Sequence, residues 1–124
     1  AGSDFLLMPS RYEPCGLSQS YAQCFGSLPI GHRTGGLADT IEDDQTGFLF
    51  DQMTPTSFAG AIERAMNTYL LPDLLDAMRR KAMQAPRYWQ QTAKPYAELY
   101  HHLAESSLAS SLTLPGRSKR AWAL

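Results

Sequence analysis

The sequence contains little that marks a specialised class of protein. Its 124 residues include only two cysteines, and the spacing of Cys15 and Cys24 matches neither a zinc knuckle nor a redox pair. His, Cys and carboxylate residues form no set with metal-ligand spacing. No apolar run approaches the length of a membrane span, and residues 1–8 lack the basic flank and the length of a signal peptide. We therefore expect two free thiols, no metal, no membrane partner and a cytoplasmic location.

The charge balance gives equally little indication of a partner. The chain has 11 Lys and Arg against 12 Asp and Glu, and this net charge of -1 argues against a nucleic-acid partner. The length fits one domain or part of one. Because the chain starts without Met, directly before a buried-looking strand, we expect a fragment of a longer protein.

The segment from residue 4 to residue 26 predicts a strand, a loop and a helix in that order. A strand is expected over Asp4–Met8, whose apolar run from Phe5 ends before Pro9, and Pro14 with Gly16 prevents regular structure in the loop. A helix is expected to begin at Gly16 and to continue over Leu17–Gly26, with Gly26 as its C-cap. The apolar residues that recur there at helical spacing are Leu17, Tyr21, Cys24 and Phe25.

This order of elements is suited to binding an anion. A helix that starts just after the carboxyl end of a strand points free N–H groups into the crevice where α/β sheets bind ligands, and phosphate suits that position. Gly16 lets a ligand approach the backbone, and Glu13 can accept hydrogen bonds from ligand hydroxyls. A sugar nucleotide needs both features. The alternative is an ordinary turn with a surface Glu and a buried Cys.

Further along the chain, short apolar runs alternate with helical patterns. Strands are expected over Ser27–Arg33 and 47–50, with a helical turn over 37–41 and a solvated acidic turn over 42–47 between them. Thr54 and Pro55 are a typical helix start. Three helices with an apolar face are predicted from here on. The face of the first consists of Phe58, Ala61, Ile62, Ala65, Met66 and Tyr69, and that of the second of Leu74, Leu75, Met78 and Ala82. The face of the third helix consists of Trp89, Ala93, Tyr96, Leu99, Tyr100 and Leu103. This alternation predicts a parallel, doubly wound sheet.

Polar residues of the carboxyl-terminal half receive less specific interpretations. The basic run 79–81 is expected to be solvated, and Pro95 is expected to kink the third helix or delay its start. From Glu105 onward the pattern loses its periodicity, so residues 105–124 are expected to form a disordered tail. The aromatic face of the third helix is either an ordinary core stripe or a surface that packs on a missing domain.

Two segments of the chain resemble the carboxyl-terminal domain of bacterial glycogen synthases and plant starch synthases. Residues 1–17, with Glu13-Pro-Cys-Gly16, are similar to the donor-site segment of that family, and residues 32–41, with Arg33-Thr-Gly-Gly-Leu37, are similar to its next loop. The resemblance covers roughly residues 1–103. It implies an α/β fold, the second half of a Rossmann-like parallel-sheet domain of the GT-B type with a helical carboxyl-terminal part. Residues 1–104 would be a partial nucleotide-sugar-binding glycosyltransferase domain.

The same resemblance implies an activity and a set of site residues. Such enzymes transfer glucose from ADP-glucose to the nonreducing end of an α-1,4-glucan with retention and without a cofactor. Glu13 would be the catalytic residue that binds the donor glucose, and a single carboxylate does not make a double-displacement pair. The substrate-binding residues would be Cys15, Gly16 and Leu17, through their N–H groups, and Thr34, Gly35 and Gly36, as a second phosphate-facing loop.

The resemblance also implies partners and leaves alternatives open. The amino-terminal domain of the same enzyme would be the partner, and the basic residues that neutralise the pyrophosphate would lie outside this chain, so the isolated chain should be inactive. Transferases of the sucrose or trehalose-phosphate type are an alternative, although these usually carry a second glutamate where Tyr21 stands. A noncatalytic truncated product is the other alternative, with Gly31, His32, Pro95 and the tail in its favour.

Overall fold

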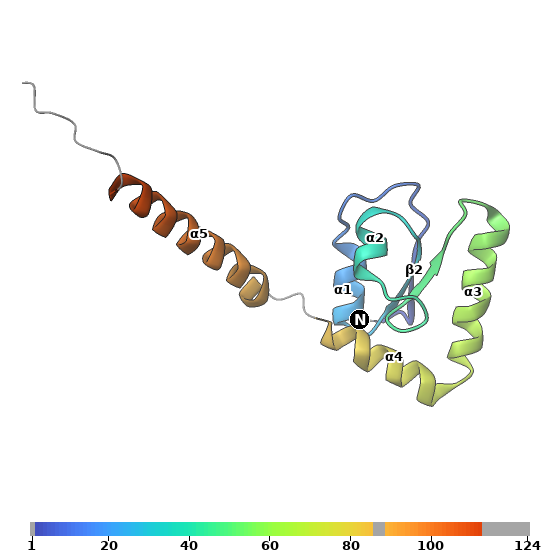
Figure 1. Cartoon of the computed structure of the whole chain (residues 1–124). Helices are drawn as coiled ribbons and strands as arrows, with labels where there is room; N and C mark the ends of the chain where they lie inside the picture. Colours follow the sequence, from blue (N-terminus) through green and yellow to red (C-terminus); the bar gives the residue numbers. More distant parts are fainter. Residues whose placement is uncertain (1, 86–88, 113–124) are drawn as a thin grey trace, which may run out of the picture. The chain divides into compact units, whose positions relative to one another are not determined.

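A three-stranded parallel sheet forms the centre of the amino-terminal part of the chain. The computed structural model describes residues 2–85 and 89–112, and the chain divides into two units, Ala1–Ala85 and Pro86–Leu124, which are described separately. In the first unit the strands lie in the order β1 (Phe5–Met8), β2 (Leu28–His32), β3 (Phe48–Phe50). The helices of this unit are α1 (Ser18–Cys24), α2 (Gly35–Thr40), α3 (Pro55–Tyr69) and α4 (Pro72–Gln84) (Figure 1). The predicted parallel α/β architecture and its three strands are therefore confirmed.

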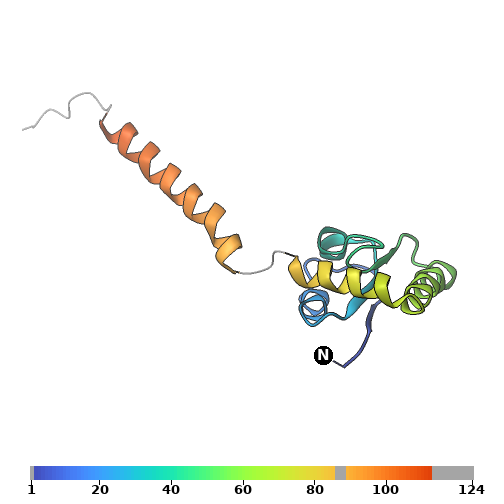
Figure 2. The same cartoon turned by 90° about the horizontal axis from the view of Figure 1, so that it is seen from below.

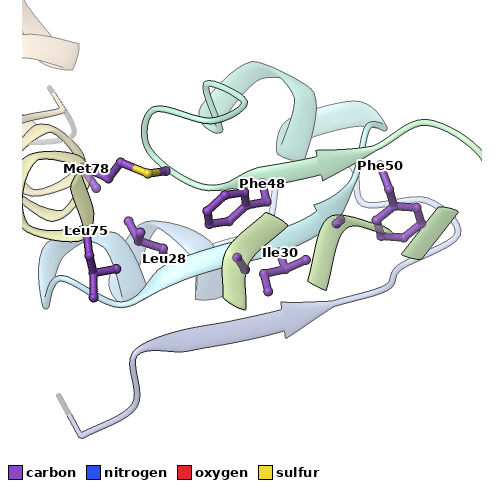
Figure 3. Packing of buried hydrophobic residues seen from close by; sticks show 9 residues of the cluster. Leu28, Ile30, Phe48, Phe50, Leu75 and Met78 are labelled. Atoms are coloured by element: carbon purple, nitrogen blue, oxygen red, sulfur yellow. The ribbon is translucent and has the colours of Figure 1, made fainter. Parts of the chain in front are cut away.

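Helices cover both faces of this sheet. On one face α3 and α4 pack on a cluster of buried side chains, and Figure 3 shows its members along β2 and β3. On the other face a smaller cluster of Leu37, Ile41 and Leu49 joins α2 to β3. The alternation along β3, with Leu49 on one face and its two neighbours on the other, is that of a strand buried on both sides.

The helix α4 lies at the amino end of the strands. Its buried residues Leu75 and Met78 lie beside Leu28, the first residue of β2, whereas Phe50 lies at the far end of the sheet (Figure 3). Seen from below, α4 crosses the view between α1 and α3 (Figure 2). The loops that follow the strands therefore gather at the opposite, carboxyl end of the sheet.

Several helix ends follow from local sequence signals. The Oγ1 of Thr54 accepts a hydrogen bond of 3.2 Å from the N–H of Ser57, and Pro55 opens α3 as predicted. Gly26 follows α1 with a φ of +74°, the left-handed conformation that ends many helices. The helix α2 begins at Gly35 and α1 at Ser18, so the predicted start of α1 at Gly16 is wrong.

The apolar faces predicted for three helices are partly wrong. In α1 the residues at helical spacing are exposed, with 62% exposure for both Leu17 and Tyr21, because the helix packs through its glutamines instead. In α3 the buried stripe is Ala61, Ala65 and Thr68, so Met66 and Tyr69 of the predicted face are about half exposed. Of the face predicted for α4, Leu74 is exposed.

The second unit contains the helix α5 (Trp89–Leu112), which includes Pro95. This helix includes residues 105–112 of the segment 105–124 for which a disordered tail is predicted. Residues 113–124, the rest of the predicted tail, lie outside the described residues. The interpretation of the α5 face with Tyr96, Leu99, Tyr100 and Leu103, as a core stripe or as a surface that packs on a missing domain, stays a prediction. None of the helices described here is long and apolar enough to cross a bilayer.

Candidate functional site

Three loops meet at the carboxyl end of the sheet. They follow β1, β2 and β3 and comprise residues 9–17, 33–34 and 51–54. Because the strands are parallel, the loops lie at one edge, which is where α/β sheets bind ligands. Arg33 joins the second loop to the third, since its N–H donates to the carbonyl oxygen of Phe50 and its Nε to Asp51, at 2.9 and 2.5 Å. This hydrogen bond to Asp51 raises the pKa of Arg33 above its ordinary value.

The first loop is held by its carbonyl oxygens. The Nδ1 of His32 lies 3.1 Å from the carbonyl oxygen of Ser10, and the His32 ring packs on Phe50 at 5.3 Å between ring centroids. The N–H of Gly36 donates to the carbonyl oxygen of Glu13 at 2.8 Å. The structure thus confirms the interpretation of His32 as a satisfied strand histidine. These contacts fix the loop and leave its N–H groups uncommitted.

The two predicted donor loops are in direct backbone contact. A Cβ built on Gly35 would overlap the carbonyl oxygen of Glu13, and a Cβ on Gly36 would overlap the backbone of Cys15. Gly35 also has a φ of +41°, in the left-handed region. These glycines therefore allow one backbone to approach another, whereas the sequence was interpreted as making room for a ligand.

The N–H groups of the first loop are free. Within the part of the chain that the structure describes, the N–H groups of Cys15, Gly16 and Leu17 donate no hydrogen bond, and the half-buried Glu13 has a carboxylate without a partner. Gly16 has a φ of +68°. These are the groups that a phosphate or a hydroxylated ligand would pair with.

The second loop offers fewer free donors than predicted. The N–H of Thr34 donates to the carbonyl oxygen of His32 at 2.8 Å, and that of Gly36 is taken up by Glu13. The expectation that these two N–H groups face a phosphate is therefore wrong. The N–H of Gly35 and the hydroxyl of Thr34 have no partner among the described residues. The assignment of the loop to donor binding stays a prediction.

Two buried glutamines of α1 escaped prediction. Gln19 and Gln23 are fully buried, and their amides bond to main-chain carbonyl oxygens. Gln23 donates to the carbonyl oxygen of Thr46 at 2.9 Å, and Gln19 to that of Gly16 at 2.7 Å. The signal in the sequence was their spacing of four residues, which places both on one helix face, opposite the apolar residues.

The acidic turn is not simply solvated, as was expected. Asp43 accepts from Arg33 at 2.7 Å, from Arg64 at 3.1 Å and from the N–H of Leu49 at 2.8 Å. Arg64 in turn donates to the carbonyl oxygen of Leu49 at 2.6 Å. This cluster ties β3 to the Arg33 end of the second loop. The expectation of solvated basic residues on α4 is also wrong for Arg79 and Lys81, which pair with Asp4 and Glu42.

The cysteines and Arg11 are exposed polar residues in or near the site. Cys15 and Cys24 are both exposed free thiols, so the alternative of a buried Cys is wrong. Arg11 is exposed and has no ion-pair partner in residues 2–85 or 89–112. Within the same ranges no three His, Cys, Asp or Glu side chains lie where they could share a metal ion.

Two depressions border Pro9, where the first loop begins. A depression of about 420 Å³ follows the end of β1 and is lined by residues 6–10 and by Ser18, the first residue of α1. A second depression, of about 300 Å³, lies between Arg11 and the start of α3, with Phe50 and Phe58 in its wall. The carboxyl end of the sheet is therefore accessible on both sides of the first loop.

Comparison with protein families and with known proteins finds relatives of this chain. Residues 1–85, which include all three strands and both loops of the site, match the family model of glycosyl transferases group 1. The chain belongs to this family. It is 60% identical over 111 residues to a glycogen synthase of Pseudomonas syringae and 63% identical over 107 residues to one of Pseudomonas aeruginosa. These matches cover 90% and 86% of the chain, which spans only 23% and 21% of those glycogen synthases.

Two solved structures resemble the chain as well. The catalytic domain of starch synthase IV from Arabidopsis thaliana, bound to ADP and acarbose, is 36% identical with a TM-score of 0.72, over 81% of this chain and 22% of that one. Sucrose-phosphate synthase from Thermosynechococcus elongatus is 29% identical with a TM-score of 0.68, over 83% and 26%. This group 1 chain therefore corresponds to part of a GT-B catalytic region.

Proposed function

We propose that this glycosyl transferase segment supplies donor-site residues to a glycogen synthase that uses ADP-glucose. The support comes from the free N–H groups of residues 15–17, the unpaired Glu13 carboxylate beside them, and the glycogen synthases that are about 60% identical. The starch synthase relative was solved with ADP bound, which favours an adenine nucleotide. The free N–H groups carry the proposal, since they are suited to an oxygen-rich anion.

Each part of the site has a distinct role in this proposal. Glu13 binds a hydroxyl of the donor glucose and is the catalytic residue. The N–H groups of Cys15, Gly16 and Leu17 bind the sugar or the pyrophosphate. In the second loop the Gly35 N–H and the Thr34 hydroxyl bind the donor, while Gly36 acts through its contact with Glu13. The transfer takes place on one face of the sugar, with the leaving phosphate assisting deprotonation of the acceptor.

The remaining partners and the location belong to the same proposal. The acceptor is an α-1,4-glucan, and the rest of the donor site and the amino-terminal domain come from the same protein. The edge of β1 that has no strand partner among the described residues offers such a continuation of the sheet. A cytoplasmic location is supported by the two exposed free thiols, because oxidising compartments favour their pairing.

Calorimetric titration of the chain with ADP-glucose, UDP-glucose and ADP tests the proposal. Loss of a hydrogen bond to a charged group at Glu13→Ala should weaken ADP-glucose binding about tenfold or more. Binding of ADP should hardly change, since Glu13 contacts the sugar. The matched control is Glu63→Ala, which removes an exposed glutamate of α3. Equal loss of ADP and ADP-glucose binding, or an equal effect of the control, would contradict the assigned role.

A further inference from the structure

The buried amide of Gln19 lies among acceptors that belong to both loops of the site. Its Nε2 is 3.0 Å from the carbonyl oxygen of Cys15, 2.7 Å from that of Gly16 and 3.1 Å from the Oγ1 of Thr40. The side chain is fully buried although it starts from a short surface helix. Nothing in the donor-binding roles described so far uses this residue.

Thr40 extends this connection to the second loop. Its Oγ1 donates to the carbonyl oxygen of Gly36 at 2.5 Å, and the N–H of Gly36 donates to the carbonyl oxygen of Glu13. A closed circuit of hydrogen bonds thus runs from the Glu13–Gly16 segment through Gln19 and Thr40 to Gly36 and back to Glu13. Neither loop can shift without breaking a member of this circuit.

We propose that Gln19 and Thr40 are a pair of positioning residues that hold the two donor loops as one unit. The pair fixes the carbonyl oxygens of the first loop, which keeps the N–H groups of Cys15, Gly16 and Leu17 and the Glu13 carboxylate in place for the donor. This role rests on the proposed function for the identity of the donor. The coupling between the two loops does not depend on the proposed function.

The chemistry of the amide explains why this position holds a glutamine. The NH₂ group supplies two donors without charge, and every group within its reach is an acceptor. A carboxylate here would face carbonyl oxygens, and an apolar side chain would leave them unpaired. The Oε1 of Gln19 is buried without a partner, and a Cβ on Gly16 would overlap it. Gly16 therefore serves Gln19 as well as the left-handed turn.

The chain contains a matched control for this role. Gln23 lies one helical turn further along the same face of α1 and is equally buried. Its amide donates to the carbonyl oxygens of Thr40 and Thr46, which both lie outside the first loop. Gln23→Met removes a similar buried amide without cutting the circuit.

Amide hydrogen exchange of the full chain tests the coupling directly. In Gln19→Met and in Thr40→Val the N–H of Gly36 should exchange about tenfold faster relative to the N–H of Arg33, which bonds to Phe50. Thr40→Ser keeps the hydroxyl and should restore slow exchange. Gln23→Met should leave the ratio unchanged. An unchanged ratio in both Gln19→Met and Thr40→Val, or an equal change in Gln23→Met, would overturn the proposal.

Donor titration of the same variants separates this proposal from the proposed function. If the native chain binds ADP-glucose, Gln19→Met should weaken binding about tenfold and Gln23→Met should not. Faster Gly36 exchange in Gln19→Met in a chain that binds no donor would refute the proposed function and support the coupling. Should Gln19→Met not fold, Thr40→Val tests the same circuit from the other loop.

Discussion

Alanine in place of Gly36 should separate the two loops of the site. Gly36 is buried, and an added Cβ would overlap the Cα, C and O atoms of Cys15. All three are main-chain atoms, so no side chain can rotate away to make room. The start of α2 must move instead, and the 2.8 Å hydrogen bond from Gly36 to Glu13 is then lost.

The expected cost of this substitution follows from two contributions. Overpacking of a tight contact costs about 1–3 kcal/mol, and the lost hydrogen bond adds about 1 kcal/mol. We therefore expect Gly36→Ala to lower the free energy of unfolding by about 2–4 kcal/mol, a large part of the total of about 5–15 kcal/mol for a domain.

Urea unfolding followed by circular dichroism measures this effect, and Gly60→Ala is its control. Gly60 lies inside α3, and a Cβ there would meet no atom within 4 Å. Because alanine favours a helix over glycine, Gly60→Ala should raise the free energy of unfolding by about 0.5–1 kcal/mol. The two substitutions of glycine by alanine should therefore change the free energy of unfolding in opposite directions. A Gly36→Ala chain as stable as the native chain would refute the reasoning about backbone contact.

Three further results are expected. Arg64→Ala should lower the free energy of unfolding by about 1–2 kcal/mol, because the bonds of Arg64 to Leu49 and Asp43 are lost. The control Glu63→Ala should change the free energy of unfolding by less than about 0.5 kcal/mol. Equal effects of the two substitutions in urea unfolding would contradict this prediction. Thr54→Ala should cost about 1 kcal/mol and Thr54→Ser much less, by the same measurement, since the hydroxyl caps α3. The isolated chain should not elongate maltooligosaccharides with ADP-glucose, and glucan growth in a chain-length assay would disprove this.

Local signals made the strands and the starts of α3 and α4 predictable. Pro9, Pro55 and Pro72 end or open an element through their backbone chemistry, and Thr54 opens α3 through its hydroxyl, so neighbouring residues suffice to locate these ends. The first donor segment was located in the same way, from a loop that proline and glycine force.

Contacts between distant segments were not predictable from one sequence. The burial of Gln19 and Gln23 depends on hydrogen-bond acceptors in the first loop, α2 and the acidic turn, so apolar spacing alone selected the wrong face of α1. Likewise, Gly35 and Gly36 gave the signal of a ligand loop, but what they approach is the backbone of Glu13 and Cys15. In both cases a tertiary contact between distant segments decides what the residues do, and a single sequence does not reveal such a contact.

The most direct test of the account is an NMR titration of the ¹⁵N-labelled chain with ADP-glucose. If the free N–H groups form the donor site, the largest shifts should occur at the amides of Cys15, Gly16, Leu17 and Gly35, while the amide of Gly60 in α3 should not move. Absence of any shift at these amides at millimolar donor, or larger shifts along α3, would contradict the assignment of the site.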